Sequence, residues 1–462
     1  MSGKIFFSKS VFYFIVLLIF SSLCSCGGGG GGGGSSSLSK ENILITDGNR
    51  REWTFIVYMA ADNDLEGEAM RNLNQLEAVS SISSDRISVL VLIDRSPGYD
   101  STDGDWTDTR LYEVMPDSGG VNTVLVSKRI ACPALELTED GSRELDMSDY
   151  RVLGSAVSFA ESSYQAENYA LIIWGHGTGW RSAASARGFA VDDTTGSAAA
   201  MPAAQMRLAL EGRGLSFIGF DTCFSSILEI CYELKDCSPV LIGTPGLAPG
   251  EGWNYSDLFS SFIAGDMTAE SFEDSLISSY SSHYASVSGC AVDVIDSSKI
   301  QDVSTGLESL ARTMSGCIIN AAMRNTAVSF LLNSSIGYGS SSFPSDWFVN
   351  IYNFSEGVAA HPEIFSADSA VQDELRNRAL SLKAAVSLAV RKSWSSDGLD
   401  KPFGVHVIPL TGYSTPASRH SDAYIKGTSV LYRPQFVTDS VWWVPSQPPE
   451  HSLLDRLFYT DF

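Results

Sequence analysis

Asn168-Tyr-Ala-Leu-Ile-Ile-Trp174-Gly-His176-Gly-Thr-Gly-Trp180 is the stretch that decides the fold. Its apolar run from Tyr169 to Trp174 predicts a strand buried on both faces, as the strands of parallel sheets are. The run ends at His176, which stands among three glycines, and glycine lets a backbone turn sharply and lets a substrate come close. The stretch therefore predicts an α/β fold with a histidine at the carboxyl end of a central strand.

A second segment repeats this design. Residues 215–220 are mostly apolar, Asp221-Thr222-Cys223 follows, and residues 224–234 have a helical pattern. Two parallel strands that end in His176 and Cys223 place an acid–base group and a nucleophile at the sheet edge where open α/β folds bind ligands. A helix start after Cys223 would favour the thiolate, and the Gly177 N–H could face an oxyanion. The alternative is a buried, inert cysteine and a structural histidine.

Composition limits the class of protein. The chain has 462 residues, 44% of them hydrophobic, which is enough for a large core, and a formal charge of −23. Such acidity argues against nucleic acid and anionic membranes as partners and favours basic substrates. The eight cysteines include no CxxC pair, so no zinc site is predicted, although one or two disulfides would fit an exported protein. We expect a monomer.

The N-terminal region predicts export. Residues 1–25 combine two lysines with an apolar run that is short for a membrane span, and Leu23-Cys24-Ser25-Cys26 resembles a bacterial lipobox with Cys26 as the lipidated residue. The Gly/Ser-rich stretch 26–50 predicts a flexible tether. The expected location is the cell envelope or outer surface, with membrane contact only through the lipid. The alternative is an ordinary signal peptide cut nearby.

The rest of the chain divides into a catalytic core over 51–256 and a helical and β-hairpin C-terminal part over 257–462. In the core, strands are expected at 53–59, 87–93, 111–114 and 239–244, a hairpin at 121–130, helices at 65–79, 149–162 and 203–210, and a small-residue linker at 182–200. Beyond the core, helices are expected at 257–263, 269–284, 297–333 and 367–394, a strand at 290–295, and hairpins at 403–409 and 424–443. Alternating strands and helices indicate a mostly parallel sheet.

The order of the two reactive residues separates this chain from other hydrolases. His176 precedes Cys223 by 47 residues, and the G-x-S-x-G motif of α/β-hydrolases is absent. His-Gly after one strand and Asp-x-Cys after the next resemble the caspase, legumain, gingipain and clostripain group. The segments that carry the resemblance to clostripain-like peptidases are Trp53-Thr-Phe-Ile-Val-Tyr-Met-Ala-Ala-Asp-Asn-Asp-Leu-Glu66, Trp174-Gly-His-Gly-Thr-Gly-Trp180, Gly219-Phe-Asp-Thr-Cys223 and Gly252-Trp-Asn-Tyr255.

This resemblance, from about residue 51 to 443, implies a caspase-like α/β/α sandwich and a cysteine endopeptidase with Cys223 and His176 as its dyad. It also implies that Asp221 lines the pocket for the residue before the scissile bond and pairs there with Arg or Lys. The alternative role of Asp221 is to cap the following helix. Glu251 could add a second acid to the pocket. Thr222 departs from the alanine that the family commonly has.

Calcium is the one cofactor that the resemblance makes conceivable. Asp62, Asp64, Asp103, Asp105, Asp192 and Asp193 are conceivable ligands, none with diagnostic spacing. An EF-hand loop from Asp62 is rejected, because position 12 would be Leu73. A solvated acidic surface is the favoured explanation, and no metal site is assigned.

The sequence as a whole predicts an exported, lipid-anchored endopeptidase that cuts proteins or peptides after basic residues. The alternative is a non-catalytic adhesin or scaffold that keeps the fold. Arg181 and Arg187 lie in the linker between the catalytic strands and are candidate sites of self-cleavage. An intact linker is the alternative to such processing.

Overall fold

The structure is a computed structural model that describes residues 50–179, 188–194, 199–333, 335–336, 347–398 and 401–407. The leader and tether with Cys26, the linker arginines Arg181 and Arg187, and the hairpins expected over 424–443 lie outside these residues. No helix in the described ranges is both long enough and apolar enough to span a membrane.

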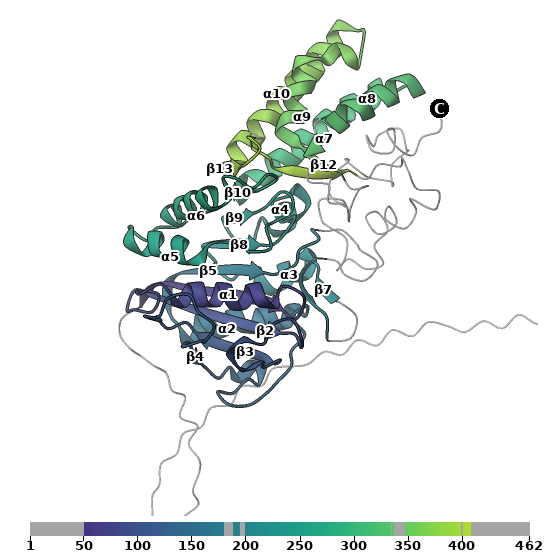
Figure 1. The fold of residues 1–462 in the computed structure, drawn as a ribbon. Helices are drawn as coiled ribbons and strands as arrows, with labels where there is room; N and C mark the ends of the chain where they lie inside the picture. Colours follow the sequence, from purple (N-terminus) through teal and green to yellow (C-terminus); the bar gives the residue numbers. More distant parts are fainter. Residues whose placement is uncertain are drawn as a thin grey trace, which may run out of the picture. The chain divides into compact units, whose positions relative to one another are not determined.

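A nine-stranded sheet organises the fold, with strands in the order β13-β10-β9-β8-β5-β1-β2-β3-β4 (Figure 1). These strands are β1 (Arg51–Ala61), β2 (Ile87–Arg95), β3 (Thr109–Glu113), β4 (Lys128–Arg129), β5 (Ala166–Trp174), β8 (Phe217–Asp221), β9 (Val240–Gly243), β10 (Ala291–Asp296) and β13 (Val390–Ser395). The strands from β9 to β2 are parallel, and the pairs at both edges are antiparallel. The predicted α/β class with a mostly parallel sheet is confirmed.

Helices cover both faces of this sheet. The helices of the described chain are α1 (Glu66–Glu77), α2 (Tyr150–Ser163), α3 (Ala203–Leu210), α4 (Leu228–Leu234), α5 (Tyr255–Ala264), α6 (Ala269–Tyr284), α7 (Ile300–Cys317), α8 (Ala321–Asn333), α9 (Ile351–Ala360) and α10 (Ser369–Ala389), of which α8 and α9 lie against β12 (Trp347–Asn350) of a smaller sheet. Side chains of a strand alternate between faces. Phe55 and Val57 of β1 therefore share a core with α1, α5 and α6, whereas Ile56 and Tyr58 share another with α2, α3, α4 and α7. Two cores on one sheet make the α/β/α sandwich.

The C-terminal part contributes to the same sheet, because β10 and β13 lie beyond residue 257. It also forms a small sheet of β11 (Ser335–Ile336), β12 (Trp347–Asn350) and β14 (Gly404–Val407). A bridge between Gly404 and Ile227, the residue before α4, joins β14 to the chain that follows Cys223. The chain after residue 257 is thus built into the catalytic core.

Two helix predictions in this part are wrong. The helix expected over 367–394 ends at Ala389, and residues 390–395 form β13 because they pair with β10 and bring Trp394 against Tyr280, 5.9 Å between ring centroids. The helix expected over 297–333 is two helices, α7 and α8, with a break after Cys317. Helix α9, capped by Asn350, was not anticipated.

The predictions of a hairpin and of a linker are also wrong. In the hairpin expected over 121–130 only Lys128–Arg129 is a strand, since Val121, Val124 and Val126 are exposed and Asn122 and Asp117 hold the chain in turns. The linker expected over 182–200 contains β6 (Phe189–Asp192), which pairs with β7 (Ala199–Met201).

Candidate active site

The register of β5 and β8 brings the predicted dyad together. These strands are parallel neighbours, and Trp174 at the end of β5 pairs with Asp221 at the end of β8. His176 and Cys223 each follow two residues later, so they occupy equivalent places beyond paired strand ends. Both line a cavity of about 110 Å³ at the carboxyl edge of the sheet.

His176 is positioned by the turn before it and by a carboxylate beside it. Gly175 has a φ of +131°, and a Cβ there would lie 2.7 Å from the Ala60 carbonyl oxygen, so the turn needs glycine. His176 Nε2 lies 2.6 Å from Oδ1 of Asp64, in the turn between β1 and α1. An ionised carboxylate only accepts, so Nε2 carries the proton and Nδ1 remains for proton transfer.

Asp64 orients the His176 ring and contributes little to the stability of the fold. The side chains of His176 and Asp64 are 38% and 66% exposed, and an exposed pair of this kind contributes about 0–1 kcal/mol. Sequence reasoning named Asp64 only as a calcium candidate. The local sequence does not reveal that Asp64 pairs with His176, because 112 residues separate the two.

Cys223 lies half-buried in a loop rather than at a helix start. Its Sγ accepts a hydrogen bond from the Ala248 N–H at 3.2 Å. Helix α4 begins only at Leu228, so the expected thiolate stabilisation by a helix terminus is wrong.

Gly177 lies against the nucleophile. A Cβ on this residue would collide with the Cys223 carbonyl oxygen and would approach Thr222, so only glycine lets the histidine loop lie this close. The loop is tied to β6 by Thr178, whose N–H donates to the Gly188 carbonyl at 2.9 Å. The Gly177 N–H is not the donor in that contact.

Asp221 lines the same cavity and is 6% exposed. Its Oδ2 accepts hydrogen bonds from the Trp253 N–H (2.8 Å) and the Tyr255 hydroxyl (3.1 Å). Burial raises the pKa of this carboxyl to about 7, although both hydrogen bonds oppose the shift. The described residues provide no cation beside it, so a positive group that entered the cavity would relieve an unfavourable buried charge.

The alternative role of Asp221 as a helix cap does not occur. The N-cap residue of α4 is Ile227, without a side-chain cap hydrogen bond. The carboxylate of Asp221 is held by the chain that follows β9 and by the first residue of α5. Trp253 and Tyr255, which hold it, were part of a motif quoted for the resemblance but had been given no role.

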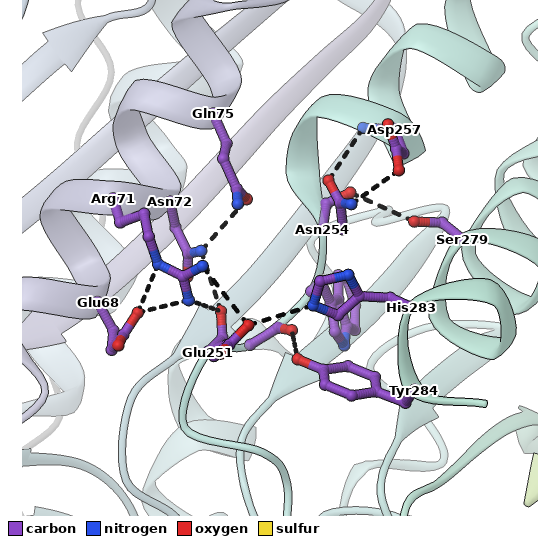
Figure 2. A network of polar contacts seen from close by, with 12 residues as sticks. Glu68, Arg71, Asn72, Gln75, Glu251, Asn254, Asp257, Ser279, His283 and Tyr284 are labelled. Carbon is purple, nitrogen blue, oxygen red and sulfur yellow. Dashed lines mark hydrogen bonds and ion pairs between the residues drawn. The ribbon is translucent and has the colours of Figure 1, made fainter. Parts of the chain in front are cut away.

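Glu251 does not line the cavity, so its expected place as a second pocket acid is wrong. Figure 2 shows its carboxylate between Arg71 of α1 and His283 of α6. The nitrogen–oxygen distances are 3.6 and 3.2 Å. The hydrogen bond with His283, followed by the charge of Arg71, holds the pKa of Glu251 below its usual value. Its partners lie on helices distant in sequence, which the local pattern does not reveal.

The same network positions the loop that forms one wall of the cavity. Asn72 donates from Nδ2 to the Glu251 carbonyl (3.1 Å) and accepts at Oδ1 from the Trp174 indole N–H (2.8 Å). Tyr284 donates to the Gly252 carbonyl at 2.5 Å (Figure 2). Because Trp174 and Gly252 both line the cavity, α1 and α6 fix its width through these contacts.

Carboxylates also gather where the resemblance allowed calcium. In the described part of the chain, one group of acids has oxygens within 4.8 Å of one another, and it consists of Asp62, Asp94, Glu144 and Asp192. Of the conceivable ligands, it includes Asp62 and Asp192 but not Asp64, Asp103, Asp105 or Asp193. Two buried carboxylate oxygens in this group, Asp62 Oδ1 and Asp94 Oδ2, lack a hydrogen-bond partner, so the residues fit a cation that binds oxygen.

The six cysteines in the described residues are free, and the possible disulfides are not found among them.

Comparison with known proteins gives a consistent family. A sequence model of the clostripain family matches residues 57–376. Clostripain from Hathewaya histolytica is 25% identical over 232 residues, which cover 46% of this chain and 43% of clostripain. The match therefore spans less than half the length of that relative.

Two solved structures share the fold. One is a secreted C11 cysteine protease from Bacteroides thetaiotaomicron in complex with an irreversible peptide inhibitor, with 19% identity, a TM-score of 0.54, and 85% of this chain and 99% of that chain covered. The other is an inactive zymogen C11 protease from Parabacteroides distasonis, with 15% identity, a TM-score of 0.55, and 78% and 93% covered.

Proposed function

The chain belongs to the clostripain family, and on that premise we propose that it is a cysteine endopeptidase that cleaves after arginine or lysine. The observation that carries the proposal is one small cavity shared by His176, Cys223 and the buried carboxylate of Asp221. A nucleophile, an acid–base group and an anionic recognition group are the parts that such a reaction needs.

The reaction follows from these positions. The Cys223 thiolate attacks the carbonyl carbon of the scissile bond, and the oxygen gains negative charge beside the Gly177 N–H. The protonated Nδ1 of His176 then donates its proton to the leaving amine as the C–N bond breaks, which leaves a thioester on Cys223. Water loses a proton to Nδ1 and attacks the thioester, so the acid is released and the thiolate returns.

Asp221 supports the proposed preference for basic residues. A guanidinium or ammonium in the cavity would form charge-assisted hydrogen bonds with this carboxylate and lower its pKa from about 7. An apolar or acidic side chain would leave the carboxylate uncompensated or add repulsion. The preference for basic side chains therefore arises because they compensate a carboxylate that is unfavourably buried in the empty pocket.

A peptide panel tests this function. With the protein produced without residues 1–26, we expect kcat/KM for Arg or Lys before the scissile bond to exceed that for Asp, Asn or Ala by at least about 100-fold. The assay is run with calcium and with a chelator, beside a Cys223→Ala control. Equal cleavage after Ala and Arg would rule out the specificity, and a properly folded protein that cleaves no peptide would favour the scaffold alternative.

We further propose that the protein is exported and held to a membrane by a lipid on Cys26, because Leu23-Cys24-Ser25-Cys26 resembles a lipobox and a Gly/Ser tether follows. Cys26→Ala is expected to abolish incorporation of labelled fatty acid and to move the protein out of the membrane fraction. Cys24→Ala is the matched control and should leave labelling in place. Absence of label on the unaltered protein would refute the anchor.

A further inference from the structure

A buried carboxyl group two strands away from β8 has no part in the reaction described above. Asp293 lies in β10, beside β9 (Figure 1), and is 0% exposed. Its Oδ2 accepts a hydrogen bond from the Ser226 hydroxyl at 2.9 Å, whereas its Oδ1 is buried without a hydrogen-bond partner. Burial raises the pKa of this carboxyl to about 7, although the bond from Ser226 and the charge of Lys401 oppose the rise. A buried carboxyl with an unsatisfied oxygen destabilises a fold, so its presence needs an explanation.

Ser226 belongs to the turn that follows the nucleophile, residues 223–227, and this turn is strained. Phe224, directly after Cys223, has a φ of +52°, a left-handed conformation that is rare for a bulky side chain. In this conformation the Phe224 N–H donates to the Gly246 carbonyl at 2.7 Å. A strained backbone persists only where the surrounding contacts determine it. The contacts that hold residues 223–227 therefore decide where Sγ of Cys223 lies.

The chain that leaves β9 holds this turn from one side. The Thr244 carbonyl accepts from the N–H groups of Ser225 (2.8 Å) and Ser226 (3.1 Å), and the Thr244 N–H donates to the Ser225 hydroxyl (3.0 Å). Gly243, the last residue of β9, makes room for the turn, because a Cβ there would lie 2.5 Å from the Ser225 hydroxyl oxygen. The turn thus lies over the end of β9.

Asp293 reaches the same turn from the next strand. It pairs in register with Gly243. Side chains alternate along β10, so Asp293 is on the face of Ala291 and Ile295, which share a core with α4 and α7. Because Gly243 has no side chain on that face, the carboxyl of Asp293 can extend across β9 to Ser226. A side chain from β10 therefore adds to the backbone contacts that hold the turn.

We propose that Asp293 is a positioning residue for the nucleophile, which acts through its hydrogen bond with Ser226. The bond fixes the strained turn, and the turn fixes Sγ of Cys223 in the cavity that it shares with His176. Attack requires the reacting atoms to lie about 3–3.5 Å apart with the right alignment, and a misplacement of about 1 Å can cost about 100-fold in rate. Asp293 itself does not line the cavity. The proposal deepens the proposed function and rests on it, because it takes Cys223 as the nucleophile.

An irreversible inhibitor separates attack by sulfur from binding. A peptidyl chloromethyl ketone with arginine next to the ketone binds reversibly with a constant KI, and Sγ of Cys223 then displaces chloride with a rate constant kinact. In Asp293→Ala we expect kinact to fall about 100-fold and KI to stay within about threefold. Binding should be preserved because Trp253 and Tyr255, not this turn, hold the carboxylate of Asp221. Intact mass counts the inhibitors bound per chain.

Further variants show whether the hydrogen bond is responsible. Asp293→Asn keeps an oxygen that accepts from Ser226, so its kinact should stay within about threefold of the parent value. Ser226→Ala removes the donor and should lower kinact as Asp293→Ala does. The double variant should be no slower than either single variant, because both side chains act through one bond. Ser238→Ala is the control, since it removes a buried hydrogen bond with Val240 at the opposite end of β9, and it should lose stability without a change in kinact.

Urea unfolding of each variant ensures that rates are compared in folded protein. If Asp293→Ala fails to fold, Ser226→Ala, which loses a single oxygen atom, carries the test. The parent value of kinact in folded Asp293→Ala or Ser226→Ala overturns the positioning role, as does an equal loss in Asp293→Asn and Asp293→Ala. A parent protein that takes up no inhibitor at Cys223 refutes the proposed function, and the positioning role with it.

Discussion

Replacement of Cys223 by alanine is expected to reduce kcat/KM for basic peptides by at least about 10⁴-fold while the fold survives. The side chain is half-buried, and among the described residues that line the cavity it is the one thiol, the group that can form the thioester. Peptide hydrolysis and labelling by a thiol-directed inhibitor with a basic side chain are the measurements. Substantial hydrolysis by the variant would contradict the mechanism.

Cys231 and Cys237 provide the controls. Both are buried, and burial raises the pKa of Cys231 well above its usual value and that of Cys237 to about 12. They remain thiols at neutral pH and are poor nucleophiles. Alanine at Cys237 should therefore leave kcat/KM within about threefold and inhibitor labelling unchanged.

Cys223→Ala also tests self-processing, which we propose on sequence grounds for Arg181 or Arg187. Both fragments of a protein cut there would stay associated, because β5 and β8 from either side of the linker pair in one sheet. Intact mass should show two chains for the active protein and one for Cys223→Ala. A single chain in fully active protein would refute the processing.

Replacement of Asp221 by asparagine is expected to lower kcat/KM for Arg and Lys peptides about 10²- to 10³-fold, because a desolvated cation would lose its charged partner. The amide oxygen can still accept from Trp253 and Tyr255, so the pocket keeps its shape. The preference of this variant for Arg and Lys over neutral residues should fall as well. Unchanged preference for Arg over Ala in this variant would contradict the assigned role.

The substitution should stabilise the free protein in a pH-dependent way. The folded carboxyl has a pKa of about 7, against 3.8 for an ordinary aspartate, so between these values the folded chain keeps a proton that the unfolded chain has lost. Stability contributed by Asp221 therefore falls as pH rises and stays low above pH 7. At about 1.4 kcal/mol per pKa unit the loss is on the order of 4 kcal/mol.

Urea unfolding at pH 5 and pH 8 measures this effect. Asp221→Asn should exceed the parent in unfolding free energy at pH 8, and the difference should shrink at pH 5. Glu251→Gln is a matched control, since it removes an acid that lies near the cavity but outside it. The exposed ion pairs of Glu251 with Arg71 and His283 contribute about 0–1 kcal/mol to stability, so Glu251→Gln should change stability little. The substrate specificity of this variant should also be unchanged. An equal gain in stability at both pH values would contradict the raised pKa.

The sequence by itself determined the α/β class, the parallel central strands and the placement of His176 and Cys223 at neighbouring strand ends. It could do so because these features are local: an apolar run defines a buried strand, and the glycines and polar residues after it define where it stops. The resemblance to clostripain-like peptidases rests on those same short segments, and their order along the chain suffices to identify the family.

The tertiary structure alone decided what depends on partners distant in sequence. Residues 390–395 continue a helical pattern but become β13, because β10, about 100 residues earlier, offers an unpaired edge. Glu251 turns from the cavity to helices α1 and α6, and Asp64 meets His176 across 112 residues. The carboxylates of Asp62, Asp94, Glu144 and Asp192 converge from four segments. Side-chain direction, burial and pairing at these places are set by packing between elements, which no local pattern of residues encodes.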